Sequence, residues 1–150
     1  MSLKEQIDAD IKRAMLAKSK EELEALRSIK SLILLAETEK GGTDEITGEA
    51  EKKLLMKAAK QRKESAEIFE QQNRKDLADR ELMQLEVINR YLPKQLSEEE
   101  IKSELAFVIK EVGASGPQDM GKVMGVATKK LAGQADGKII SELVKKLLSP

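Results

Sequence analysis

Apolar residues recur every three or four positions along most of the chain, which is the spacing that aligns them on one face of an α-helix. Leu3, Ile7, Ile11 and Ala14 form the first such stripe. No stretch alternates apolar and polar residues as a half-buried β-strand does. The pattern predicts an all-α protein with four helices over about residues 3–18, 20–40, 48–72 and 74–91, followed by three shorter helices that start after Ser97, at Pro117 and after Asp136.

Residues that favour helix ends stand between these segments. The sequence GGTDEITG, residues 41–48, stops the second helix and predicts a polar loop. Asn73 can adopt the left-handed conformation that closes the third helix. Ser97 and Glu100 have the spacing of a capping box, and Asp136 can cap the last helix.

A proline divides the chain into two parts. Pro93 disfavours a helical conformation of Leu92, so the fourth helix should end there. We therefore expect an N-terminal four-helix domain over residues 1–92, a connector over residues 93–96, and a small three-helix C-terminal domain over residues 97–150.

Two charged residues stand where the inward stripes should be apolar. Arg62 interrupts the stripe of the third helix, and Glu81 interrupts that of the fourth. If these helices form a hairpin about Asn73, the two side chains lie within about one helical turn of each other. Both side chains could reach to the edge of the stripe, they could form an ion pair that fixes the register, or Arg62 could bind an anion. We assign Arg62 and Glu81 as a candidate structural ion pair.

The composition excludes most catalytic chemistry. The 150 residues include no Cys, no His and no Trp, so no thiolate, imidazole base or Cys/His zinc site can form. A metal could bind only through carboxylates and carbonyls, and no motif has the spacing of such a site or of a phosphate-binding loop. We expect no metal and no cofactor.

Nothing in the sequence resembles a targeting or membrane segment. Residues 1–20 mix charged and apolar side chains and lack the apolar core of a signal peptide. The longest uninterrupted apolar runs, such as residues 32–36, are far shorter than the roughly 20 residues of a membrane-spanning helix. We expect a cytoplasmic protein that does not contact membranes.

The charge is zero overall but not in every region. The chain has 27 basic and 27 acidic residues, whereas residues 117–150 have six lysines and three acidic residues. Lys122 and Lys129 are seven positions apart, and so are Lys138 and Lys145, so each pair lies on one face of its helix.

Two glycines lie near the first lysine pair. Gly121 and Gly125 are four positions apart, and because they lack side chains another backbone can approach them closely. The sequence leaves two interpretations open. The approaching backbone could be a neighbouring helix, with the lysines forming a solvated surface, or it could be a phosphodiester chain.

Five separated segments together resemble the bacterial YqeY family. They occur in the order found in that family, and the match covers about the whole chain: KQRKES with Phe69, RKDLA with Glu81, YLPKQLS at residues 91–97, MGKVM at 120–124 and GQADGK at 133–138. The resemblance implies an N-terminal helical domain followed by a smaller helical domain.

The smaller domain is similar to the C-terminal tail domain of GatB, the B subunit of the amidotransferase that converts Glu-tRNA(Gln) or Asp-tRNA(Asn) to the amidated form. In that complex the tail domain helps to hold the tRNA. The resemblance implies that glycines of this region permit close approach and that its lysines meet phosphates. The candidate nucleic-acid-binding residues are Gly121, Lys122, Gly125, Lys129, Lys130, Lys138 and Lys145.

The resemblance does not extend to the catalytic parts of the amidotransferase. Glutamine hydrolysis there belongs to a Ser-Ser-Lys amidase subunit, and amide transfer belongs to the large N-terminal domain of the B subunit. The family carries the label of a glutamine-dependent carbon–nitrogen ligase by domain association.

We therefore expect a non-catalytic tRNA- or RNA-associated binding module, whose partner is tRNA or a complex that charges or amidates tRNA. A helical protein–protein adaptor is the alternative, and it predicts an exposed apolar patch, with the connector YLPKQL at residues 91–96 as its candidate. A carbon–nitrogen ligase with glutamine as amido-N donor ranks last. The sequence does not indicate an oligomeric state.

Overall fold

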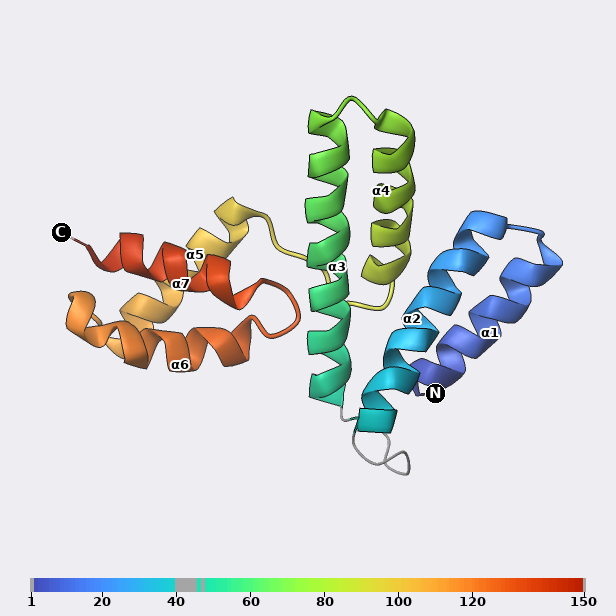
Figure 1. Ribbon diagram of the computed structural model, residues 1–150. Coiled ribbons are helices and arrows are strands. Elements are labelled where there is room, and N and C mark those ends of the chain that lie inside the picture. Colours follow the sequence, from blue (N-terminus) through green and yellow to red (C-terminus); the bar gives the residue numbers. More distant parts are fainter. Residues whose placement is uncertain (1, 40–45, 47, 150) are drawn as a thin grey trace. The chain divides into compact units, whose positions relative to one another are not determined.

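The computed structural model describes residues 2–39, 46 and 48–149, so most of the expected loop over residues 41–48 lies outside the described residues (Figure 1). The described residues form seven α-helices and one 3-10 helix and contain no strand, which confirms the all-α prediction. The elements are α1 (Leu3–Leu16), α2 (Lys20–Glu39), α3 (Gly48–Gln71), α4 (Lys75–Asn89), α5 (Glu98–Val112), η1 (Pro117–Asp119), α6 (Met120–Lys130) and α7 (Gly137–Leu148).

The helices end where local chemistry stops them. Asn73 adopts a left-handed φ of 57° between α3 and α4, as expected. Ser97 and Glu100 form the reciprocal capping box at the start of α5. The side chain of Asp136 accepts a hydrogen bond from the backbone N–H of Lys138 and caps α7. Pro117 is the first residue of the 3-10 turn η1, and α6 begins only after this turn, at Met120. Short 3-10 turns of this kind are frequent at the N-termini of α-helices.

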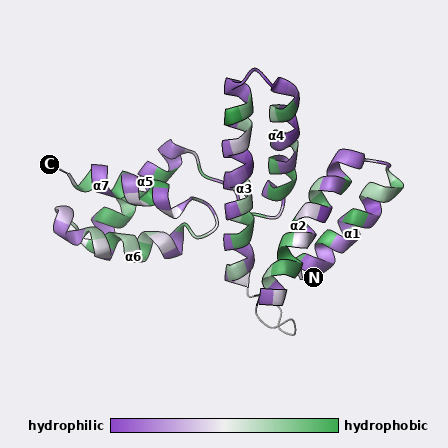
Figure 2. Ribbon diagram, viewed as in Figure 1, coloured by the Kyte–Doolittle hydropathy of each residue, from purple (hydrophilic) through white to green (hydrophobic). Residues whose placement is uncertain are grey.

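The described chain separates into two compact units, residues 1–92 and residues 93–150. The first unit contains α1 to α4, and the second contains α5, η1, α6 and α7. In the ribbon coloured by hydropathy, hydrophobic and hydrophilic residues alternate around the helices, as amphipathic helices require (Figure 2). Over the described residues, no helix combines the length and the hydrophobicity that crossing a membrane would need.

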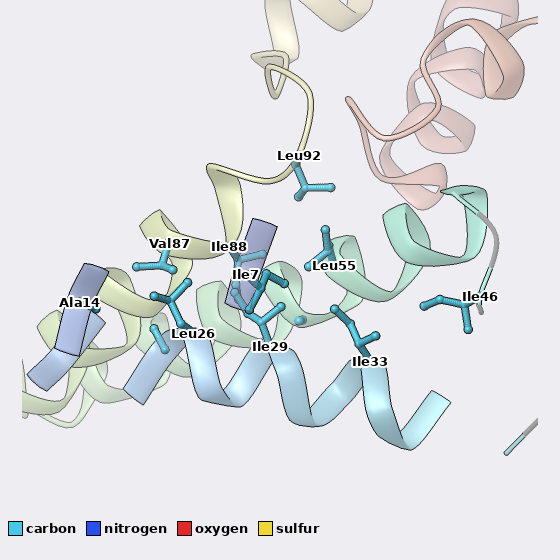
Figure 3. Packing of buried hydrophobic residues seen from close by; sticks show 12 residues of the cluster. Ile7, Ala14, Leu26, Ile29, Ile33, Ile46, Leu55, Val87, Ile88 and Leu92 are labelled. Carbon is cyan, nitrogen blue, oxygen red and sulfur yellow. The ribbon is translucent and has the colours of Figure 1, made fainter. Parts of the chain in front are cut away.

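The core of the first unit is almost entirely aliphatic. Leu26, Ile29 and Ile33 of α2 point into it together with Ile7 of α1 and Leu55 of α3 (Figure 3). Each of these five side chains has an exposed fraction of 2% or less. The second helix is therefore central to this unit, and it contacts α1, α3 and α4.

Ion pairs cross between the helices around this core. They join α1 to α2 and α2 to α4, with N···O distances of 2.6 to 3.2 Å: Lys4–Glu37, Lys30–Asp8, Arg80–Glu24 and Arg90–Glu22. The hydroxyl of Tyr91 donates a hydrogen bond to Asp10 of α1. Because aliphatic side chains pack without strict directionality, these polar contacts add geometric specificity to the helix arrangement.

Arg62 and Glu81 meet across the α3–α4 hairpin. Nη1 of Arg62 lies 3.1 Å from Oε2 of Glu81, and Nη2 lies 3.4 Å from the hydroxyl oxygen of Ser28 on α2. The exposed fractions of the two charged side chains are 30% and 17%, so neither extends freely into water. Arg62 thus connects three helices at one position.

The core of the second unit is built by α5, α6 and α7. Leu105 and Val108 of α5, Val123 and Ala127 of α6, and Val144 of α7 are fully buried in it. The connector contributes as well, because Leu96 packs against this core and its N–H donates to the carbonyl oxygen of Gln134 at 3.0 Å. Gln95 donates to the carbonyl oxygen of Gly133 at 2.7 Å. Residues 93–96 therefore belong structurally to the second unit.

The Arg62–Glu81 contact should be measurable as an energetic coupling. In a double-mutant cycle of Arg62→Ala and Glu81→Ala, we expect the two losses of unfolding free energy to be non-additive by about 1 kcal/mol, because each single change leaves a half-buried charge without its partner. Urea unfolding of the four proteins measures this coupling. Strict additivity would mean that the two side chains are solvated independently. The same cycle at the exposed Arg74–Asp76 pair serves as the control and should give a smaller coupling.

Candidate nucleic-acid interface

The position of α6 is fixed by the side chains that it buries. Val123 and Ala127 have no exposed surface, and Leu131, just past the helix, is 1% exposed. These residues follow the helical spacing of four and face α5 and α7. The opposite side of α6 must therefore face solvent, and it carries Lys122 and Lys129.

Gly121 and Gly125 lie on this outward side and are exposed. A Cβ atom placed on either glycine would have no atom of the described residues within 4 Å, other than its own helix backbone and chain neighbours. Within the C-terminal unit, these glycines therefore pack against no other described helix. A glycine inside an exposed helix lowers helix stability by about 0.5 to 1 kcal/mol relative to alanine, and the described fold gains no packing contact in return.

The glycines are among the residues that line a shallow, wide-open depression of about 630 Å³. We call this surface the glycine–lysine face, and its lining residues are Gly121, Lys122, Gly125, Val126, Lys129 and Lys130. Of the seven residues that the sequence suggested for nucleic-acid binding, the structure brings five together here. An extended chain could lie over the glycines with cationic side chains beside it.

The three lysines of this face differ in their surroundings. Nζ of Lys130 lies 3.1 Å from Oε2 of Glu104 and 4.3 Å from the centroid of the Phe107 ring, both on α5. Its charge is thus partly compensated within the protein. Lys122 and Lys129 are exposed and point to the solvent side of α6. They are the lysines of this face best suited to meet an external phosphate.

An acidic residue stands at the start of the same helix. Asp119 accepts a hydrogen bond from the backbone N–H of Ser115 at 2.9 Å, and this bond, with the positive charge of Lys122 as a smaller cause, holds the pKa of Asp119 below its usual value. Asp119 is therefore ionised at neutral pH, and its hydrogen bond with Ser115 stabilises the turn before α6.

Lys138 and Lys145 lie on α7 and are exposed, but neither lines the depression on α6. Their spacing of seven places both on the side of α7 that faces away from its buried residues Ile140 and Val144. The second predicted lysine pair thus forms a separate basic surface of the same unit. The sequence pattern could not give this separation, because it depends on how α6 and α7 pack.

Glu104 and Phe107 were not among the residues that the sequence singled out. Both lie on α5, whereas the glycine–lysine face lies on α6, and only the packing of the two helices brings them to Lys130. In the part of the chain that the structure describes, no three acidic residues gather in a way that could hold a metal ion.

Comparison with known proteins shows a matching family and several relatives. The model of the YqeY family, described as Yqey-like protein, matches residues 4–148. A relative from Clavispora lusitaniae, named altered inheritance of mitochondria protein 41, mitochondrial, is 38% identical over 111 residues, which is 73% of this chain and 64% of the relative.

Two further relatives carry the same name. The protein from Lachancea thermotolerans is 34% identical over 72% of this chain and 58% of its own length. The protein from Pyrenophora tritici-repentis is 31% identical over 95% of this chain and 78% of its own length. The chain thus spans less than two thirds of the length of the first two relatives. Their names refer to mitochondria, and a cytoplasmic location of this chain stays a prediction.

The environment of the glycines leads to a stability prediction. Gly125→Ala should raise the unfolding free energy by about 0.5 to 1 kcal/mol, because alanine is the better helix former and the added methyl group enters open space. Urea unfolding followed by circular dichroism measures the change. Gly113→Ala is the matched control and should lower stability by about 1 kcal/mol, because Gly113 has a φ of +70°. A destabilising Gly125→Ala change would mean that the fold itself needs this glycine.

Proposed function

Since the chain belongs to the YqeY family of Yqey-like proteins, we propose that it is a non-catalytic module that binds tRNA or another RNA through its C-terminal unit. The observation that carries this proposal is the glycine–lysine face. It combines two exposed glycines that pack against no other described helix with two exposed lysines on the same side of α6.

The geometry of this face suits a phosphodiester backbone. The absence of side chains at Gly121 and Gly125 lets a bulky chain come close to α6. Lys122 and Lys129, which share one face of α6, then contact phosphates of that chain. Such contacts position a nucleic acid but do not read its sequence. Lys138 and Lys145 on α7 provide further cations for other phosphates of the same RNA.

The neutral charge of the whole chain does not oppose this proposal. Exposed charges are screened beyond about 8 to 10 Å at physiological ionic strength, so distant acidic residues have little effect on a phosphate at α6. A phosphate at α6 would experience mainly the nearby charges, which are those of Lys122 and Lys129 and that of Lys130, partly compensated by Glu104.

The two other candidate functions have less support. An adaptor role through the connector at residues 91–96 would need exposed apolar side chains there, but Leu92 is 8% exposed and Leu96 packs against the second core. A glutamine-dependent ligase has the least support, because the resemblance does not extend to the Ser-Ser-Lys amidase subunit or to the domain that performs amide transfer, and the chain has neither Cys nor His. We therefore rank RNA binding first, the adaptor second and the ligase last.

The test is a titration of tRNA at several salt concentrations, followed by fluorescence anisotropy. For the wild type, we expect binding that weakens steeply with salt, with a log–log slope of about −0.7 to −0.9 per phosphate neutralised. The variant Lys122→Ala/Lys129→Ala should bind more weakly at low salt and should have a slope shallower by about two, because each lysine accounts for about one phosphate contact.

The matched control removes the same charge from the other unit. Lys53→Ala/Lys57→Ala changes two exposed lysines of α3 and should leave the affinity and the slope unchanged. If both double variants weaken binding equally, the effect is one of net charge and the assignment to α6 fails. If the wild type does not bind tRNA at low salt, the proposed function itself is wrong.

A further inference from the structure

Phe107 is the most exposed aromatic residue of a chain that has only three. Its exposed fraction is 56%, whereas its neighbours Leu105 and Val108 on α5 are completely buried. Because those two residues fix the rotation of α5, the ring of Phe107 cannot turn into the core. A large apolar ring is thus held at the surface of the C-terminal unit.

Lys130 joins this ring to the glycine–lysine face. Its Nζ atom lies over one face of the Phe107 ring, 4.3 Å from the centroid, which leaves the opposite face of the ring for a base. The same residue lines the depression that contains Lys122 and Lys129. The ring therefore adjoins the proposed RNA-binding surface across the contact between α5 and α6.

We propose that Phe107 is a stacking platform for an unpaired base of the RNA, so that the preferred ligand is a single strand or a loop and not a continuous duplex. This inference rests on the proposed function. An aromatic ring beside a row of lysines is the combination by which proteins bind single strands, because the bases stack on the ring while the phosphates follow the cations. Bases inside a duplex are paired and stacked on each other, so they cannot reach the ring.

Glu104 determines where the base and the phosphates of the RNA lie on this surface. Its carboxylate lies 3.1 Å from Nζ of Lys130 and compensates the charge of that lysine beside the ring. A phosphate is repelled by this carboxylate, whereas an uncharged base is not. The base therefore lies at Phe107, and the phosphates lie toward Lys122 and Lys129 on the other side of the face.

The experiment compares two RNA probes on the full chain. One is an oligouridylate, which is single-stranded, and the other is an RNA duplex with the same number of phosphates. Phe107→Leu keeps an apolar side chain of similar size but removes the aromatic ring. It should weaken binding of the oligouridylate about tenfold, from the loss of one stacked base, and leave binding of the duplex unchanged. Phe69→Leu, the same change in the other unit, should leave both affinities unchanged.

A second variant reports stacking directly. Because the chain has no tryptophan, Phe107→Trp provides a single tryptophan, whose fluorescence can be excited selectively, at this position. The oligouridylate should quench its fluorescence on binding, and the duplex should not.

The outcomes separate this inference from the proposed function. If Phe107→Leu binds both probes as the wild type does, or loses affinity for both equally, Phe107 is not a stacking platform, whereas the salt-dependent effect of Lys122→Ala/Lys129→Ala still supports RNA binding. Absence of quenching at saturating oligouridylate also overturns the stacking role. If the wild type binds neither probe at low salt, the stacking role and the proposed function fail together.

Discussion

The burial of one side of α6 is the constraint on which the C-terminal unit and its candidate site depend. Val123, Ala127 and Leu131 pack against α5 and α7, so the opposite side of the helix faces water. Gly121, Gly125, Lys122 and Lys129 lie on that opposite side. The same packing that stabilises the unit thus presents an exposed surface whose two glycines weaken the helix and contact no other described helix.

In the N-terminal unit, polar contacts between helices supplement the aliphatic core. With few aromatic residues, its core is made of aliphatic side chains whose packing alone allows more than one register. Arg62 limits this freedom, because it contacts Glu81 on α4 and Ser28 on α2 from a position on α3. Ion pairs from α2 to α1 and to the C-terminal end of α4 likewise restrict the register of these helices. Both units are therefore held together by the packing of aliphatic side chains, and in the first unit polar contacts between helices add to it.

Local features of the fold could be predicted from the sequence, and non-local ones could not. The helix ends at Asn73, Ser97 and Asp136 follow from side chains that act within a few residues of their own position. The outward position of the glycines could not be foreseen, because a glycine that faces a neighbouring helix and one that faces solvent have the same sequence pattern. The contact of Lys130 with α5 likewise depends on packing between helices.

The central claim is that RNA contacts the outward side of α6, and a titration of tRNA into ¹⁵N-labelled protein followed by NMR tests it most directly. The account predicts that the largest changes in backbone amide shifts occur at Gly121, Gly125 and Lys129, with smaller ones near Lys138 and Lys145 on α7. Changes concentrated on α2 and α3, or no changes at low salt, would contradict it.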